Sequence, residues 1–147
     1  SATLEAERCA EFFGGATIVH VPGRSHPVEI RHRPPPPDES DLVQPLLAAI
    51  AELDASDYGD ILVFLPGERE IAELGDALGK AGLRNTAILP LYARLGAREQ
   101  QRVFAPHRER HIILATNVAE TSLTVPGVRH VIDSGLVRLA TYSPRSR

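Results

Sequence analysis

The spacing of apolar residues predicts a chain in which strands and helices alternate. The runs 60–65, 86–91 and 111–115 are almost continuously apolar, which is typical of strands covered on both faces of a sheet. Between these runs, apolar residues recur at helical spacing over 68–81 and 97–104. Strands that alternate with helices predict a mainly parallel sheet flanked by helices, so we expect an α/β fold.

Further elements are expected on either side of this region. Apolar residues at helical spacing predict a helix over 42–53, ahead of the first strand. After the last of the three strands, the pattern predicts a short helix over 118–122 and two more strands, 128–133 and 136–142.

The first 33 residues differ from the rest of the chain. They are expected to form a helix over 4–13 and strands over 16–21 and 28–32, and they are too few to bury a core of their own. The four prolines that follow can continue neither a helix nor a central strand, and they predict a stiff linker. We therefore expect three parts: the end of another domain at 1–33, a proline linker at 34–37 and one domain at 38–147.

Composition narrows the class of protein. Apolar residues make up 43% of the chain and charged residues 24%, which is ordinary for a globular domain. No run of about 18 apolar residues occurs, so we expect neither a membrane-spanning helix nor a membrane partner. Cys9 is the only cysteine, which excludes an internal disulfide and a multi-cysteine zinc site and fits a cytoplasmic protein.

Charge is distributed unevenly along the chain. Residues 1–74 carry 14 acidic side chains against 5 arginines, whereas residues 75–147 carry 5 acidic side chains against 11 basic ones, all but Lys80 arginine. Arginine makes forked contacts to phosphate, so the C-terminal half is the better candidate for a surface that faces a polyanion. Solvated charge spread around a globular domain is the alternative.

Several kinds of active site are absent from the sequence. The segment 75–81 resembles a phosphate-binding loop, but it is one residue short between its glycines, lacks the Ser or Thr that holds magnesium, and lies within a predicted helix. His107 and His111 enclose Glu109 in a spacing that is not His-Glu-x-x-His, which favours a solvated loop before a strand. We predict no metal ligands in this chain.

Polar residues follow the three central strands, where ligands bind in open α/β sheets. These segments are 65–70, 89–94 and 115–124. Hydroxyls, an amide and free helix N–H groups would form an anion site in the third segment, although each residue alone is equally typical of helix capping. The polar residues of the third segment are Thr116, Asn117, Glu120, Thr121, Ser122 and Thr124.

The same segments carry a resemblance to superfamily 2 helicases. Residues 1–3 (Ser-Ala-Thr) resemble motif III, 61–71 motif IV, 89–93 motif IVa and 115–124 motif V. The string Ala-Glu-Thr-Ser-Leu-Thr within motif V is similar to that of the DEAH-box branch, and the run from residue 60 onward most resembles its bacterial HrpA-type group. The resemblance extends over essentially the whole chain.

This resemblance implies a RecA-like three-layer domain, the second of two in an ATP-dependent RNA helicase, preceded by a short tail of the first. It implies ATP with Mg²⁺ in the cleft between the two domains, with the magnesium ligands outside this chain. The implied partners are the backbone of single-stranded RNA and the first RecA-like domain of the same protein. Because the Walker motifs and the arginine-rich motif VI are not among these residues, the chain alone is expected to be inactive.

Individual residues take expected roles from the family motifs. Thr116 and Asn117 resemble the motif V residues that hold the RNA backbone, and Gly67 resembles a close backbone contact in motif IV. Thr124 belongs to motif V as well, and the resemblance implies that it also binds RNA.

Other positions are expected at the nucleotide. Ser122 resembles the serine that senses the γ-phosphate, and Phe104 the aromatic that stacks on adenine. Ser1 and Thr3 resemble the motif III residues that couple hydrolysis to unwinding.

Two alternatives stay open. A DNA-directed superfamily 2 helicase would use the same motifs, because contacts to the backbone do not read bases. A non-catalytic α/β interaction module would share the sheet, because fold alone does not fix function, but it would leave the polar cluster at 116–124 unexplained.

Overall fold

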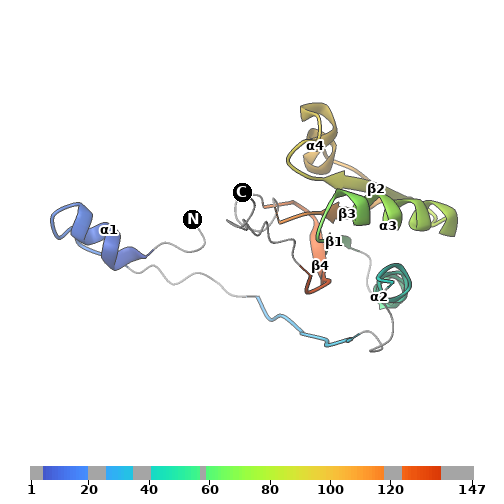
Figure 1. Ribbon diagram of the computed structural model, residues 1–147, viewed down its shortest axis with the longest axis horizontal. Helices are drawn as coiled ribbons and strands as arrows, with labels where there is room; N and C mark the ends of the chain where they lie inside the picture. Colours follow the sequence, from blue (N-terminus) through green and yellow to red (C-terminus); the bar gives the residue numbers. More distant parts are fainter. Residues whose placement is uncertain (1–4, 20–25, 35–40, 57–58, 118–123, 137–147) are drawn as a thin grey trace, which may run out of the picture. The chain divides into compact units, whose positions relative to one another are not determined.

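The computed structural model describes residues 5–19, 26–34, 41–56, 59–117 and 124–136. The chain divides into two compact units, Ser1–Pro36 and Pro37–Arg147. In the first unit, the described residues contain one helix, α1 (Ala6–Phe12), drawn in blue in Figure 1. Gly14 and Gly15 end it with φ angles of 72° and 84°, which are favourable only for glycine.

The strands expected at 16–21 and 28–32 are wrong wherever the structure describes them. Residues 16–19 and 26–34 are neither strand nor helix. Val19, Val28 and Ile30 are 77%, 79% and 74% exposed. Their alternating apolar residues meet neither a core nor a neighbouring strand among the described residues, and a strand persists only where its backbone groups find partners.

The described residues of the second unit form a four-stranded sheet in which every strand pair is parallel. The strand order is β2-β3-β1-β4, so β1 and β3 form the centre. Leu62 of β1 lies beside Ile113 of β3, and the next pair along is Val63 with Leu114. The strands are β1 (Asp60–Phe64), β2 (Thr86–Leu91), β3 (Arg110–Ala115) and β4 (Val128–Asp133).

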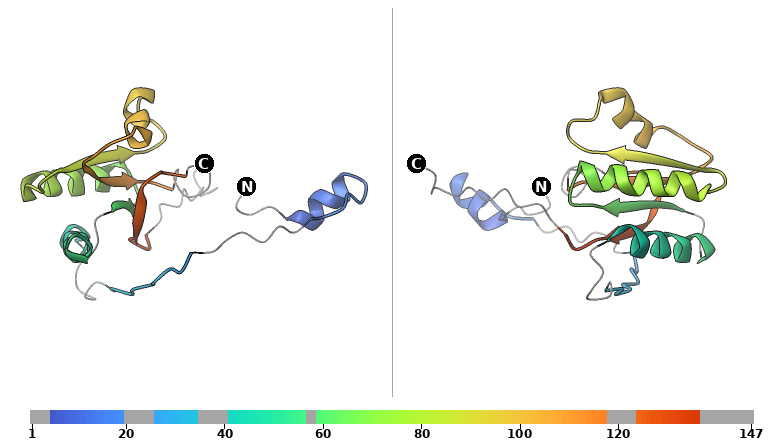
Figure 2. Two further views of the ribbon diagram at one scale, coloured as in Figure 1. Left: turned by 180° about the vertical axis from the view of Figure 1, so that it is seen from behind. Right: turned by 45° about the vertical axis from the view of Figure 1, so that its right-hand side comes forward.

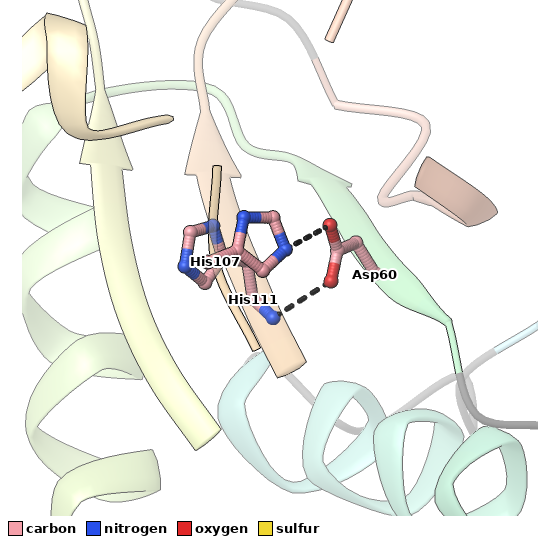
Figure 3. Close-up of side chains that lie close together, drawn as sticks. All are labelled: Asp60, His107 and His111. Carbon is pink, nitrogen blue, oxygen red and sulfur yellow. Dashed lines mark hydrogen bonds and ion pairs between the residues drawn. The ribbon is translucent and has the colours of Figure 1, made fainter. Parts of the chain in front are cut away.

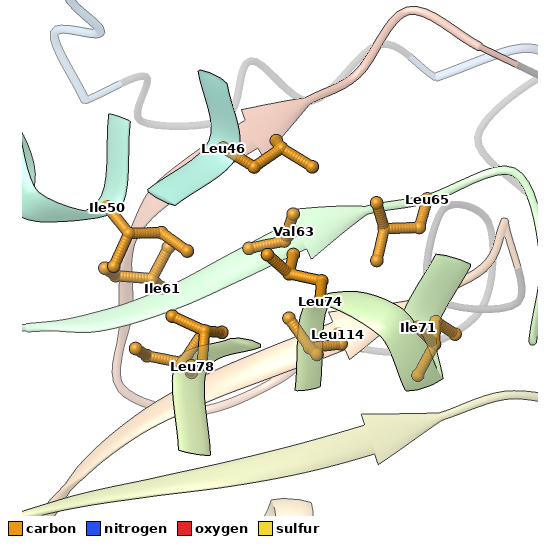
Figure 4. Close-up of a cluster of buried hydrophobic side chains, with 10 residues drawn as sticks. Leu46, Ile50, Ile61, Val63, Leu65, Ile71, Leu74, Leu78 and Leu114 are labelled. Atoms are coloured by element: carbon orange, nitrogen blue, oxygen red, sulfur yellow. The ribbon is translucent and has the colours of Figure 1, made fainter. Parts of the chain in front are cut away.

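Helices cover both faces of this sheet. On one face, α2 (Val43–Ser56) and α3 (Glu68–Ala81) lie side by side, as the right-hand view of Figure 2 shows. Their apolar residues enclose a core with alternate residues of β1 and β3 (Figure 4). On the other face, Val103 of α4 (Ala97–Phe104) packs into a second core cluster with Leu62, Leu89 and Ile113. The three-layer α/β fold is therefore confirmed.

Chain direction explains why the helices lie on opposite faces. The chain passes from β1 through α3 to β2, and then reverses through α4 to β3. Parallel crossovers are right-handed, so a reversal of direction requires the next helix to change face. Because all four strands run parallel, their carboxyl ends lie at one edge of the sheet, where the three predicted polar segments begin.

The remaining helix and strand predictions have mixed outcomes. The helices at 42–53, 68–81 and 97–104, and the strand at 128–133, are confirmed. The helix expected at 118–122 lies outside the described residues, as does the strand expected at 136–142 apart from its first residue. None of the helices in the described ranges is long and apolar enough to cross a membrane.

Candidate functional site

The three predicted polar segments are joined at the carboxyl edge of the sheet. The backbone N–H of Leu65, just after β1, donates to the carbonyl of Ala115 at 2.8 Å. The N–H of Thr116 donates to the carbonyl of Leu91 at 3.2 Å. These two hydrogen bonds continue the ladder of the sheet beyond the strands. They hold together the residues at which the chain leaves β1, β2 and β3.

Motif V begins at this edge. Thr116 is half-buried and Asn117 is exposed, so the backbone of Thr116 is fixed to the sheet while the Asn117 side chain faces solvent. Thr124 is exposed on the returning chain, and Val125 beside it is only 9% exposed and packs into the second core cluster. Both described ends of the segment are thereby held against the domain.

Gly67 lies in the adjoining motif IV loop. It is buried and extended, and its carbonyl accepts the N–H of Ile71 at 3.1 Å to begin α3. The first turn of α3 carries Glu68 and Glu70, whose carboxylates complement the helix dipole. Arg69 in the same turn pairs with Glu70, so the turn keeps a net negative charge that weakens its attraction for a phosphate.

Phe104 ends α4 and belongs to neither core cluster. It is 36% exposed, whereas its neighbour Val103 is 1% exposed. Part of the residue is therefore open to solvent, as a contact to a base requires. It ends the helix that leads to the start of β3, and it takes no part in the hydrogen bonds that join the carboxyl-edge segments.

Three predicted site residues lie outside the described residues. These are Ser1 and Thr3 of motif III and Ser122 of motif V.

The arginines of the C-terminal half do not all face solvent. Arg110 is 2% exposed, and its Nε donates to the carbonyl of Gly59 at 2.7 Å. Its backbone N–H donates to Asn85 at 2.9 Å. Arg110 links the start of β3 to the neighbouring segments. It therefore does not contribute to the basic surface that the charge distribution predicted.

A second cluster of chemically active side chains lies at the opposite, amino edge (Figure 3). Asp60 begins β1, His111 is the second residue of β3, and His107 lies in the loop before β3. One oxygen of Asp60 is 2.9 Å from Nε2 of His107, and the other accepts the backbone N–H of His111 at 2.8 Å. The imidazole rings stack with their centroids 3.4 Å apart.

Burial shifts the pKa of His111. The residue is 4% exposed, and the loss of hydration, followed by the charge of His107, lowers the pKa of the ring below its ordinary value. Asp60 and Glu109 oppose this shift without cancelling it. The buried Nδ1 of His111 has no hydrogen-bond partner.

Sequence spacing missed this cluster because its carboxylate comes from a distant segment. His107 does lie in the expected loop, but its side chain turns toward Asp60 and is only 23% exposed. An isolated aspartate at the start of an apolar strand was the one available signal, because a buried carboxylate needs a partner.

A RecA-like domain is the class that this architecture defines, with its parallel sheet, helices on both faces and polar loops at the carboxyl edge. The chain belongs to the family of the helicase conserved C-terminal domain, whose model matches residues 42–145.

Relatives of known name agree with this assignment. The chain is 52% identical to the ATP-dependent RNA helicase HrpA of Escherichia coli, covering 100% of this chain and 12% of that protein. It is 44% identical to the pre-mRNA-splicing factor ATP-dependent RNA helicase DEAH10 of Arabidopsis thaliana, covering 98% of this chain and 21% of that protein.

A solved structure is also similar over nearly the whole chain. The crystal structure of the Escherichia coli DEAH/RHA helicase HrpB matches with a TM-score of 0.84 and 36% identity, covering 99% of this chain and 19% of that one. The resemblance to DEAH-box helicases is confirmed. The chain spans only about an eighth to a fifth of the length of these relatives.

Proposed function

We propose that the chain is part of a longer ATP-dependent RNA helicase, called the parent helicase below, and that residues 38–147 belong to its second RecA-like domain. The observation that carries this proposal is the 52% identity to HrpA over the entire chain. Residues 1–33 would be the end of the first RecA-like domain and 34–37 the linker. We also propose a cytoplasmic location.

The carboxyl edge of the sheet is the proposed RNA surface. Asn117 is exposed there and follows Thr116, whose backbone is fixed by β2, while Thr124 is exposed on the chain that returns toward β4. A rigid backbone with exposed hydroxyl and amide groups can hold phosphate oxygens without net positive charge. Gly67 would offer backbone contact from the neighbouring loop.

Nucleotide contacts are proposed at Phe104 and Ser122. The half-exposed ring of Phe104 fits a stacking contact with adenine, which requires an aromatic face open to solvent. Ser122 would sense the γ-phosphate, and Ser1 and Thr3 would couple the two domains. Bound ATP supplies the free energy for movement along RNA, and its Mg²⁺ would be held by residues outside this chain.

Thr116→Ala in the parent helicase tests the proposal. A lost hydrogen bond to a charged phosphate is worth about 1.5–3 kcal/mol, so RNA affinity should fall roughly tenfold or more while basal ATP hydrolysis without RNA stays nearly unchanged. Thr86→Ala is the matched control, because the Thr86 hydroxyl binds the Arg84 carbonyl at the start of β2.

The wild-type parent helicase separates the alternatives. ATP-driven unwinding of RNA duplexes supports the proposal. Unwinding confined to DNA duplexes would replace RNA by DNA as the substrate, and the lack of any ATP hydrolysis would favour a non-catalytic module.

A further inference from the structure

Asp60, His107 and His111 converge at the amino edge of the sheet, away from the carboxyl-edge segments (Figure 3). Each can offer one ligand atom such that all three atoms lie within 4.8 Å of one another. The three residues come from β1, from the loop after α4 and from β3. An ion held among them would therefore join segments that are far apart in the sequence.

Hydrogen bonding at His107 points to a cation between its ring and Asp60. Its Nδ1 lies 3.1 Å from the carbonyl of Ala105, an acceptor, so Nδ1 carries the hydrogen. If the ring is neutral, Nε2 then carries a lone pair and is an acceptor. It lies 2.9 Å from the carboxylate oxygen of Asp60, which is also an acceptor. Two acceptors at this distance need a proton or a metal ion between them. A carbonyl that fixes the imidazole tautomer is also the usual outer partner of a metal-binding histidine.

His111 supplies a second imidazole, one nitrogen of which has no hydrogen-bond partner. Its Nδ1 is buried and has no hydrogen-bond partner, so this nitrogen is available to a ligand. A neutral imidazole nitrogen is a ligand for zinc and related ions. An unsatisfied buried nitrogen is costly unless something binds it.

We propose that Asp60, His107 and His111 form a binding site for one divalent transition-metal ion, with Zn²⁺ as the best match and water completing the coordination. Two imidazoles and one carboxylate suit Zn²⁺ and disfavour Mg²⁺, which prefers oxygen ligands. The site is structural: it links β1 to β3 and to the loop before β3, at the opposite edge of the sheet from the segments that carry Gly67, Thr116 and Asn117.

Binding requires a small local rearrangement. Tetrahedral bonds of about 2.0–2.2 Å place ligand atoms roughly 3.4 Å apart, so the 2.9 Å contact between Asp60 and His107 must open slightly. The rings, inclined by only 21°, must also turn so that both lone pairs meet. His107 can make this change, because its side chain lies in a loop and is 23% exposed, which also gives the ion a path from solvent.

Zn²⁺ titration of the full 147-residue chain after removal of metals by a chelator tests the proposal. We expect one Zn²⁺ per chain by calorimetry and, at saturation, a melting temperature raised by roughly 5 °C or more. Mg²⁺ should give neither effect. Co²⁺, used as a spectroscopic probe, should show the visible absorption of a nitrogen- and oxygen-ligated ion.

His107→Asn is the decisive variant, because it removes a ligand from an exposed loop and leaves the hydrogen bond from His111 to Asp60 in place. It should fold, as judged by circular dichroism, and lose at least tenfold in Zn²⁺ affinity together with the rise in melting temperature. His32→Asn removes an exposed histidine in the first unit and should change neither. Equal Zn²⁺ binding by wild type and His107→Asn, loss of binding in His32→Asn, or no stoichiometric binding by wild type would each overturn the proposal.

Discussion

The carboxylate of Asp60 accepts the backbone N–H of His111 at 2.8 Å, across 51 residues of sequence. Asp60 is buried at the start of β1, and His111 lies on the neighbouring central strand. The bond closes the amino edge of the sheet at its centre, where the ladder between β1 and β3 begins. At this end of the strand pair, the side chain of Asp60 therefore supplies the hydrogen bond that backbone groups supply along the rest of β1 and β3.

Asp60→Ala should destabilise the second unit. The substitution leaves the buried N–H of His111 without an acceptor and removes the partner of His107, for a loss of about 1–3 kcal/mol or more. Urea unfolding followed by circular dichroism measures the change. Asp76→Ala, at an exposed position of α3, is the control and should lie within about 0.5 kcal/mol of wild type. Equal stabilities of the two variants would contradict this account of Asp60.

Gly127→Ala should be destabilising at the same edge. Gly127 has a φ of 84°, and an added Cβ would lie 2.6 Å from a carboxylate oxygen of Asp60. The backbone conformation alone costs a non-glycine residue about 1–2 kcal/mol, and displacing the carboxylate adds to this.

Gly79→Ala gives the opposite expectation and serves as the control. Gly79 lies within α3, and nothing lies within 4 Å of an added Cβ. Alanine should stabilise the helix by about 0.5–1 kcal/mol. Thermal melts that move in the same direction for both variants would contradict the stated roles of these glycines.

The 147-residue chain should fold and yet hydrolyse no ATP. Its sequence contains neither Walker motif nor the arginine-rich motif VI, so nothing in it positions the attacking water or neutralises the charge that develops on the phosphate. A phosphate-release assay with and without RNA checks this. Release that increases with RNA and exceeds that of a mock preparation would show that the expectation is wrong.

Apolar periodicity was sufficient to predict the strands of the second unit. It did not predict the order of those strands in the sheet. The strands at 60–65 and 111–115 could be recognised because strands covered on both faces are continuously apolar. At 28–32, the alternation of apolar and polar residues also predicted a strand. That prediction failed, because no neighbouring strand or core contacts these residues among the described parts of the chain. Periodicity reports which faces are apolar, and only the folded chain determines whether anything covers them.

Contacts between distant segments were beyond sequence reasoning for a related physical reason. Asp60 and His107 are 47 residues apart and meet because β3 pairs with β1, an adjacency that the order of elements along the chain does not reveal. Arg110 was counted as surface charge for the same reason, since its burial depends on Gly59 of the neighbouring strand end. The starts of the three polar segments do lie together at the carboxyl edge, because parallel strands place their ends together in any strand order.

Phe104 and Val103 allow the nucleotide contact to be separated from packing, because they are adjacent in α4 and differ in burial. Val103 is 1% exposed within the second core cluster, so Val103→Ala should cost roughly 2 kcal/mol of stability. Phe104 is 36% exposed and outside both clusters, so Phe104→Ala should cost less, yet in the parent helicase it should raise the KM for ATP several-fold with kcat little changed. Loss of a stacking contact acts equally on bound substrate and transition state, which changes KM alone.

Urea unfolding and steady-state ATPase kinetics on the same two variants measure the stability and the KM. A large loss of stability in Phe104→Ala with an unchanged KM would show that the ring is part of the packing and that adenine lies elsewhere.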